Sequence, residues 1–320
     1  MLSGKHDLLS RHRKLSDQCK LSIIIPHKDS PDFLERLLAT IPDESDLEVI
    51  IVDDHSAEPP LITSDMRSNV RIIPNQPERK GAGSARNTGI ERANGKWLIF
   101  ADADDWFLPG AFEVVRDHLN DPVDIIYFSP DARHVSDTAR ATRQLAYVSL
   151  VREFIDEDSD WIRYRFHPPW SKLIRRDLLK KHQIQFDEAP AGDDVLFSLR
   201  IGVAAKTVQA HDTPIYCITQ GNANALTARI NEQIVSARLR VHCRYNQLLR
   251  ERGLWKYRMT TLPILRKAWR VSPQTFVRVL AFCLYNRQPL FDNWHHMRML
   301  WQRRHGATGA REARQEKSNP

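Results

Sequence analysis

Five short apolar runs alternate with helical patterns between residues 20 and about 130, and this alternation limits the fold more than any other feature. Continuous apolar runs of this length are typical of strands buried on both faces of a parallel sheet. Strands that alternate with helices predict a doubly wound α/β layer. The runs are Leu21–Pro26, Leu47–Asp54, Val70–Pro74, Trp97–Asp102 and Val123–Phe128.

The segments between these runs carry signals of helix starts and ends. The first, Ser30–Ile41, has Ser30 in a position to cap a helix and Pro31 in its first turn, followed by apolar residues at helical spacing. Residues 84–94 and 110–120 predict two more helices, and we expect Asn94-Gly95 to end the former.

The regular alternation stops after Phe128. Residues 168–204 indicate a Pro-Pro-Trp loop, a helix, an irregular loop and a second helix that begins near Asp194. We expect residues 231–300 to be mostly helical and residues 306–320 to be a disordered tail.

Charge is divided unevenly along the chain. Residues 231–320 hold 18 Lys or Arg against 5 Asp or Glu, whereas residues 1–230 hold 29 against 35. An acidic body is suited to a metal-bound anion, and a basic tail is suited to an anionic surface. Residues 278–305 mix Trp, Leu and Phe with Arg and His, so they could lie on a membrane face or pack as a solvated helical subdomain. No signature of an RNA- or DNA-binding module is present, and no nucleic-acid partner is expected.

Other patterns narrow the class of protein. No apolar run of about 18 residues exists, and residues 1–20 lack the apolar region of a signal peptide, so we expect a cytoplasmic protein. The four cysteines are far apart, which predicts reduced thiols and no zinc site. The histidines show no metal-ligand spacing.

Three carboxylates follow the fourth apolar run. Asp102, Asp104 and Asp105 repel one another unless a cation offsets their charge. Ligands of doubly wound sheets bind beyond the carboxyl ends of the strands, where Asp53-Asp54 also falls. Hard oxygen ligands of this kind bind Mg²⁺ or Mn²⁺, often together with substrate phosphates. The alternative is that these residues only cap a helix that begins near Pro109.

Two further motifs could carry chemistry. In the segment Lys80–Gly89, Arg86 occupies the position of the third glycine of a dinucleotide-binding fingerprint, so the segment does not match that motif. The segment still predicts a glycine turn before a helix, and this turn could direct Arg86 to a pyrophosphate or base. A solvated Arg86 is the alternative. Asp193 and Asp194 lie at a predicted helix start, where one could cap the helix and one could serve as a general base.

Together these stretches resemble the inverting GT-A glycosyltransferases called family two, over about residues 20–220. The resemblance rests on five motifs in the order of the family, which lie around Pro26, around Asp54, from Arg86 to Asp102, around Trp170 and around Asp194. It implies a GT-A doubly wound, mostly parallel sheet flanked by helices, with a mostly helical C-terminal extension. The expected domains are a polar extension (1–19), a catalytic domain (20–225), a basic, mostly helical region (226–305) and the tail (306–320).

The resemblance also implies roles for single residues. Asp54 reads the nucleotide base, with Pro26 lining the same pocket, and Arg86 borders the nucleotide. In the D-x-D pair, Asp102 lies near the ribose and the metal, and Asp104 is a direct ligand of Mg²⁺ or Mn²⁺.

In the second half of the domain, the resemblance implies that Asp194 is the catalytic base. Asp193 replaces a Glu that is usual in the family, and its role is left open, as is that of Asp105. Trp170 and Lys172 match a W-x-K-L pattern often found near the acceptor cleft.

The implied function is inverting transfer of a sugar from a nucleotide diphosphate donor, most often UDP-sugar, to a saccharide or lipid-linked acceptor in cell-surface polysaccharide biosynthesis. We expect the enzyme to lie in the cytoplasm. If the basic helices lie on a membrane face, it would contact the inner face of that membrane, and a lipid-linked acceptor would be favoured. One alternative is a nucleotidyltransferase or a hydrolase on the same fold. Another is a nucleotide-sugar-binding protein without catalysis.

Overall fold

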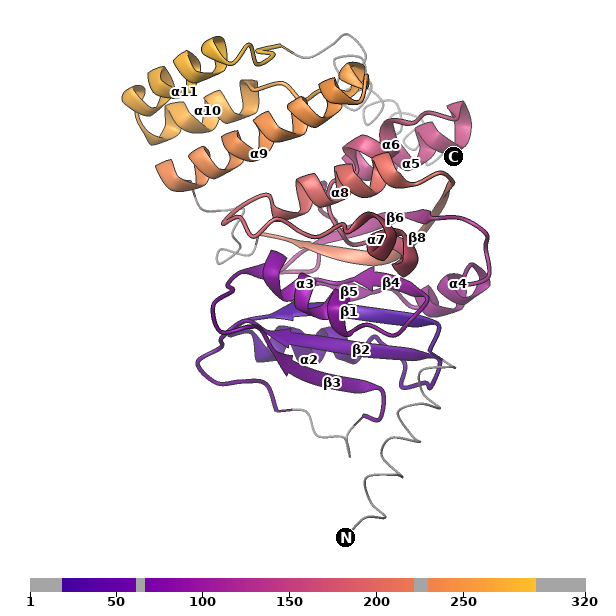
Figure 1. Ribbon diagram of the computed structural model, residues 1–320. Coiled ribbons are helices and arrows are strands. Elements are labelled where there is room, and N and C mark those ends of the chain that lie inside the picture. The colour runs from indigo at the N-terminus through magenta and orange to yellow at the C-terminus, as the bar shows by residue number, and fades with distance from the viewer. Residues whose placement is uncertain (1–18, 62–66, 222–229, 292–320) are drawn as a thin grey trace, which may run out of the picture. The chain divides into compact units, whose positions relative to one another are not determined.

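The computed structural model describes residues 19–61, 67–221 and 230–291 and divides into two compact units (Figure 1). The first unit runs from Met1 to Asn224 and contains the sheet. The second runs from Ala225 to Pro320, and its described part is helical.

Strands and helices alternate along the first unit. In the N-terminal half they are β1 (Leu21–His27), α2 (Pro31–Leu38), β2 (Leu47–Asp53), β3 (Val70–Pro74), α3 (Ala82–Arg92), β4 (Trp97–Phe100), β5 (Trp106–Phe107) and α4 (Ala111–Asp117). In the C-terminal half they are β6 (Ile125–His134), α5 (Leu145–Glu157), α6 (Trp161–Arg165), β7 (Lys172–Arg175), α7 (Arg176–His182), α8 (Asp193–Ala204) and β8 (Val208–Gln220).

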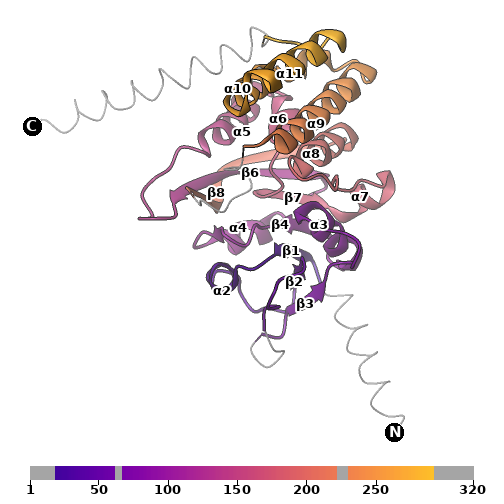
Figure 2. The same cartoon turned by 90° about the vertical axis from the view of Figure 1, so that its left-hand side faces the viewer.

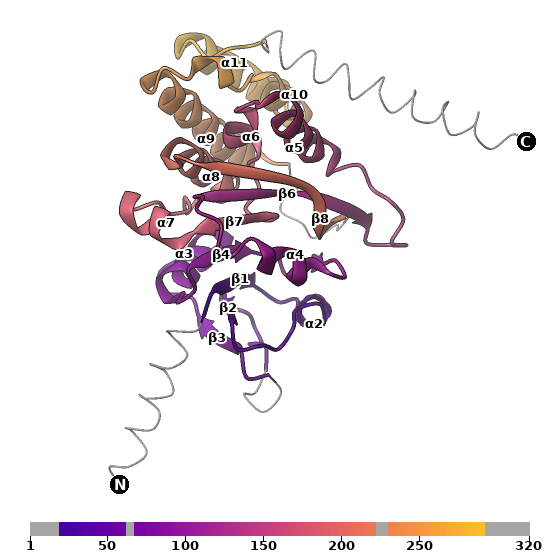
Figure 3. The same ribbon diagram turned by 90° about the vertical axis from the view of Figure 1, so that its right-hand side faces the viewer.

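The described strands form an eight-stranded sheet in the order β3-β2-β1-β4-β7-β6-β8-β5. The first four are parallel, with Ile23 of β1 paired to Val49 of β2 and Ile99 of β4. Figures 2 and 3 show α2 and α4 on one side of these strands and α3 and α7 on the other. Both faces are therefore covered, which explains the continuous apolar runs and confirms the predicted α/β class.

The other half of the sheet is mixed and was not predicted. β7 pairs antiparallel with both β4 and β6, and it lies in a segment that we expected to be helical. β8 spans 13 residues but carries Asp212 and Pro214 in its middle, so its sequence does not read as an apolar run. Periodicity identifies strands buried on both faces and misses strands with charged or interrupted sequences.

Two helix boundaries also differ from the prediction. Helix α2 begins at Pro31 as expected, but the Ser30 side chain makes no capping hydrogen bond. Helix α3 ends at Arg92, before the Asn94-Gly95 pair. Such shifts of one to three residues do not alter which residues the helices present to the sheet.

In the described part of the second unit, three α-helices pack around one apolar cluster. They are α9 (Glu232–Glu251), α10 (Leu262–Val271) and α11 (Pro273–Tyr285), with a 3₁₀ turn at Trp255–Tyr257. The cluster consists of Val235, Leu239, Ile264, Leu265, Ala268, Val279 and Cys283. This confirms the predicted helical extension, while the predicted tail (306–320) and residues 292–305 lie outside the described residues. No helix among the described residues is long and apolar enough to cross a membrane.

Gly202 sets how closely helix α8 approaches helix α6. A Cβ atom at this position would lie 1.9 Å from the carbonyl oxygen of Arg163. The Arg163 guanidinium donates back to the carbonyl oxygens of Gly202 and Ala205, so the two helices are joined at this point. The position of α8 matters because Asp193 and Asp194 form its first turn.

Gly202→Ala should lower the free energy of unfolding by about 2 kcal/mol, because the added methyl group overlaps backbone that cannot move freely. In an open helix the same change would stabilise by about 1 kcal/mol through helix propensity. Urea unfolding of the wild type and the variant measures the change in the free energy of unfolding. Gly110→Ala is the control: Gly110 has a φ of 78° and no close neighbour, so only the left-handed strain of about 1 kcal/mol applies. A stabilised Gly202→Ala protein would contradict the close approach.

Candidate active site

The chain leaves the sheet after β4 and forms a short acidic loop. Asp102 and Asp104 are partly exposed, whereas Asp105 is buried and accepts hydrogen bonds from the Thr219 backbone N (2.7 Å) and Oγ1 (3.2 Å). Burial raises the pKa of Asp105 well above its ordinary value, and the charges of Asp102 and Asp104 add to the effect. Helix α4 begins only at Ala111, with Gly110 at its N-cap, so none of the three carboxylates caps it.

Arg86 bridges two of the predicted site residues. Its Nη2 lies 2.5 Å from Asp102 Oδ1, and its Nη1 lies 2.7 Å from Asp193 Oδ2. Arg86 is only 5% exposed, so it is not the solvated side chain of the alternative interpretation. Although burial opposes the charged form, the two carboxylates raise the pKa of Arg86, and the guanidinium stays charged.

The glycine-rich turn before α3 makes this bridge possible. Gly81 has a φ of 101°, a value open mainly to glycine, and its backbone N donates to Asp54 Oδ2 at 2.8 Å. A Cβ atom on Gly83 would lie 2.4 Å from the carbonyl oxygen of Asp187 and 3.0 Å from Cβ of Asp193. The glycines therefore let α3 lie against the chain that leads into α8, which places Arg86 beside Asp193.

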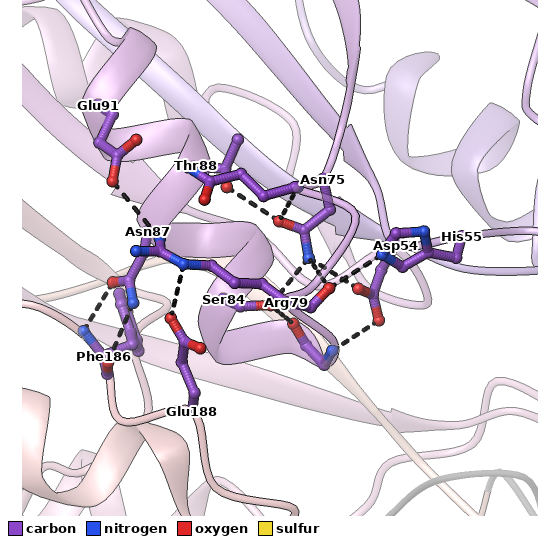
Figure 4. A network of polar contacts seen from close by, with 12 residues as sticks. Asp54, His55, Asn75, Arg79, Ser84, Asn87, Thr88, Glu91, Phe186 and Glu188 are labelled. Atoms are coloured by element: carbon purple, nitrogen blue, oxygen red, sulfur yellow. Dashed lines mark hydrogen bonds and ion pairs between the residues drawn. The ribbon is translucent and has the colours of Figure 1, made fainter.

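Asp54 lies at the end of β2 and is 5% exposed (Figure 4). Besides Gly81, it accepts a hydrogen bond from Asn75 Nδ2 at 2.8 Å. Asn75 in turn donates to Ser84 Oγ and accepts from Thr88 Oγ1, so this network joins the ends of β2 and β3 to helix α3. Both carboxylate oxygens of Asp54 already have partners, and a base could use only their remaining lone pairs. Pro26 lies on the neighbouring strand, paired with Val52.

Asp193 and Asp194 form the first turn of α8, after Gly192 at the N-cap with a φ of 79°. Both are partly exposed. Burial, helped by the neighbouring charge of Asp193, raises the pKa of Asp194 to about 7, while Arg86 acts in the opposite direction. A carboxylate that titrates near neutral pH and remains accessible can take up a proton during a reaction.

Trp170 and Lys172 lie behind these carboxylates. Trp170 is 1% exposed and Lys172 is fully buried, so neither faces solvent where an acceptor would bind. The Trp170 ring stacks on Tyr216 at 6.2 Å, and the Tyr216 hydroxyl accepts a hydrogen bond from the Asp102 backbone N at 2.8 Å. Trp170 thus supports the loop that carries Asp102.

The structure brings together Arg86, Asp102 and Asp193 directly. Asp194 follows Asp193 in sequence, and Asp104 lies two residues after Asp102. Sequence analysis missed residues that hold this group in place, above all Tyr216 and Thr219 of β8. No motif marks them, because their strand was not predicted. They could be found only from the pairing of β8 with β5, which sets Cys217 against Trp106.

The side chains at this site that could hold a metal ion are carboxylates. Among the described residues, no group of three or more His, Cys, Asp or Glu side chains could hold a metal ion. Asp102 and Asp104 fit a hard divalent cation that takes its other ligands from a diphosphate and water, as Mg²⁺ often does. Asp105 does not fit this role, since burial favours its neutral form and Thr219 binds it.

Comparison with known proteins identifies the family of the chain. The model of the glycosyl transferase family 2 matches residues 22–183. A putative glycosyltransferase of Bacillus subtilis, EpsH, is 25% identical over 209 residues, which is 61% of this chain and 59% of EpsH. A Campylobacter jejuni protein named GalNAc(5)-diNAcBac-PP-undecaprenol beta-1,3-glucosyltransferase is 28% identical over 181 residues, 55% of this chain and 57% of that protein.

Among solved structures, Staphylococcus aureus TarS 1-349 in complex with UDP-GlcNAc aligns with a TM-score of 0.59 at 16% identity, covering 83% of this chain and 81% of that one. This likeness shows the shared fold. The chain spans 59% of the length of EpsH and 55% of the length of an Escherichia coli relative. Because the family model covers half of the chain, including β1, Arg86 and the acidic loop, the protein belongs to glycosyl transferase family 2.

Proposed function

We propose that this glycosyltransferase transfers a sugar from UDP to a saccharide or lipid-linked acceptor, with inversion, during assembly of a cell-surface polysaccharide. The observation that carries the proposal is the bridge from Arg86 to Asp102 and Asp193, which sets the acidic loop after β4 beside Asp194. The C. jejuni relative, named for an undecaprenol-linked substrate, supports a lipid-linked acceptor. The UDP-GlcNAc complex of TarS supports a UDP-sugar donor.

Asp194 acts as the general base in this proposal. An acceptor hydroxyl gives its proton to the Asp194 carboxylate while the hydroxyl oxygen forms a bond to the anomeric carbon of the sugar. The bond from that carbon to the diphosphate oxygen breaks, and UDP leaves with the electron pair. Attack from the face opposite to UDP inverts the configuration.

Charge balance supports a role for a divalent cation. Arg86 offsets only part of the negative charge around it, since Asp102, Asp193 and Asp194 all raise its pKa. An anionic diphosphate would meet an excess of carboxylates here. A Mg²⁺ or Mn²⁺ ion held by Asp102 and Asp104 would stabilise the negative charge that develops on the leaving diphosphate.

The remaining predicted residues take supporting roles. Asp54 and Pro26 end adjacent strands, and we propose that they border the base. Asp193 holds Arg86 in place. We assign Trp170 to the support of Tyr216, in place of the acceptor contact that the sequence suggested.

Asp194→Asn should reduce transfer by about 100-fold or more, because an amide cannot accept the proton. UDP binding should persist. For the wild type, the rate should rise with pH through about 7, since the carboxyl must lose its proton before it can act as a base and its pKa is raised to about 7. UDP release in the presence of acceptor measures both effects. Asp117→Asn, an exposed change at the end of α4, is the control. An Asp194→Asn protein with more than a tenth of wild-type activity would refute the assignment.

Titration calorimetry with UDP, GDP and CDP, with and without Mn²⁺, tests the donor and the metal together. We expect UDP to bind at least about tenfold more tightly with Mn²⁺, because the cation offsets the repulsion between carboxylates and diphosphate. Asp104→Ala should abolish this gain. Metal-independent binding, or tighter binding of GDP, would overturn this part of the proposal. UDP release without any acceptor would favour a hydrolase, and binding without turnover would favour a protein that only binds nucleotide sugars.

The C-terminal unit carries exposed apolar side chains beside basic ones. Trp269 is 60% exposed, Tyr285 88% and Phe291 74%. The exposed basic residues Arg270 and Arg287 lie one and two residues after Trp269 and Tyr285 in sequence. Aromatic and basic side chains together are typical of surfaces that bind anionic membranes. We propose that this unit contacts the membrane that holds a lipid-linked acceptor.

Sedimentation with vesicles tests this contact. The protein should bind vesicles of phosphatidylcholine with about one third phosphatidylglycerol, and binding should fall in 0.5 M salt because exposed charges are screened. Tyr285→Glu combined with Phe291→Glu should weaken binding several-fold, whereas Ile155→Glu, an exposed change on α5, should not. Equal binding to neutral vesicles, or none to either, would contradict the proposal.

A further inference from the structure

Two side chains from α2 and the residues just after it contact the acidic loop and the strand that follows. Arg36, in the last turn of α2, donates a hydrogen bond from Nη2 to the Asp104 carbonyl oxygen. Its guanidinium carbon lies 4.6 Å from the centre of the Trp106 ring, at the start of β5. Thr40, which follows α2, accepts a hydrogen bond at Oγ1 from the Phe107 backbone N at 3.1 Å. The α2 segment therefore holds the chain where the acidic loop enters β5.

The contact with Arg36 falls between the two points at which β8 holds the loop. Strand β8 binds the backbone N of Asp102 and the carboxylate of Asp105. Asp104 lies between these points, and the hydrogen bond from Arg36 fixes the peptide group that follows it. Because the rotamers open to a side chain depend on its backbone torsions, fixing this peptide group limits where the Asp104 carboxylate can point.

The chemistry of arginine suits this position. A guanidinium group is flat, so its face can lie over an aromatic ring while an N–H at its edge donates a hydrogen bond. Phe33, three residues earlier on α2, lies 5.3 Å from the same guanidinium carbon, measured to the centre of its ring. Two aromatic rings and one carbonyl oxygen thus restrict the Arg36 side chain, which is only partly exposed.

We propose that Arg36 is a positioning residue that sets the direction of the Asp104 carboxylate for a divalent cation. This inference rests on the proposed function, in which Asp102 and Asp104 hold Mg²⁺ or Mn²⁺ together with the diphosphate. Charge alone would give Arg36 the opposite effect, because a positive guanidinium beside the site repels a cation. Loss of its charge should tighten metal binding, whereas loss of its positioning contacts should weaken metal binding. The sign of the change separates the two effects.

The affinity for Mn²⁺ in the presence of UDP tests the inference without turnover. Electron paramagnetic resonance of the free ion gives this affinity, after subtraction of the Mn²⁺ that UDP binds by itself. Arg36→Met should bind Mn²⁺ about tenfold more weakly than the wild type, because removal of a group that orients a metal ligand typically costs about 10- to 100-fold in metal affinity. Calorimetry should show that UDP binding without Mn²⁺ is unchanged.

Two further variants separate positioning from charge and stability. Arg36→Lys keeps the charge and a donor but loses the flat face over Trp106, so it should weaken Mn²⁺ binding by an intermediate amount. It also covers the case in which Arg36→Met fails to fold. Arg116→Met is the matched control: Arg116 is also a partly exposed arginine of this unit, but its partners are Glu44 and Asp46, so Mn²⁺ binding should not change.

The outcomes distinguish this inference from the proposed function. If folded Arg36→Met binds Mn²⁺ as tightly as the wild type or more tightly, Arg36 acts only on stability or through its charge, and the inference is wrong. If Arg36→Met weakens UDP binding equally with and without Mn²⁺, Arg36 contacts the nucleotide itself, and the inference is also wrong. A wild type that binds no Mn²⁺ with UDP would instead contradict the metal role in the proposed function, and this inference with it.

Discussion

The ion bridge centred on Arg86 is the interaction on which the rest of the site depends. A single buried guanidinium joins a carboxylate after β4 to a carboxylate at the start of α8, and it comes from a third element, α3. If Arg86 were lost, two carboxylates would lose their common counter-charge at once, and removing one member of a buried ion pair costs about 3–5 kcal/mol. Gly83 in the first turn of α3 and Gly202 within α8 allow these elements to approach closely, because neither position has room for a Cβ atom.

Around this bridge, charge is arranged in layers. The carboxylates are partly exposed, whereas the arginine that links Asp102 to Asp193 and the lysine at the start of β7 are buried. Specific contacts position both basic side chains. Arg86 forms ion pairs with two carboxylates, and Lys172 contacts the Phe166 carbonyl oxygen, the Ser198 hydroxyl and the rings of Phe166 and Tyr127. Such an arrangement allows neighbouring carboxylates to differ in protonation at one pH, which acid–base chemistry requires.

The sequence predicted the parallel half of the fold well, because strands buried on both faces leave unbroken apolar runs such as Leu21–Pro26. It also pointed to Asp102 and Asp104, which follow a buried strand, and to Arg86, which follows a glycine turn at the start of a helix. It could not predict β7, whose first residue is the charged Lys172, or β8, whose middle is polar. Long-range pairing determines those strands, and with them the burial of Trp170 and Lys172, for which the family resemblance implied a place near the acceptor cleft.

Strand β8 holds the acidic loop at both ends. The Tyr216 hydroxyl accepts from the backbone of Asp102, and the Thr219 backbone donates to Asp105. The loop from Asp102 to Asp105 is therefore ordered without a ligand, so ligand binding does not carry the entropy cost of ordering it. Chains that share these contacts between β8 and the acidic loop should then differ in donor preference through residues outside the loop. The ordered loop can stay the same while the residues around it change.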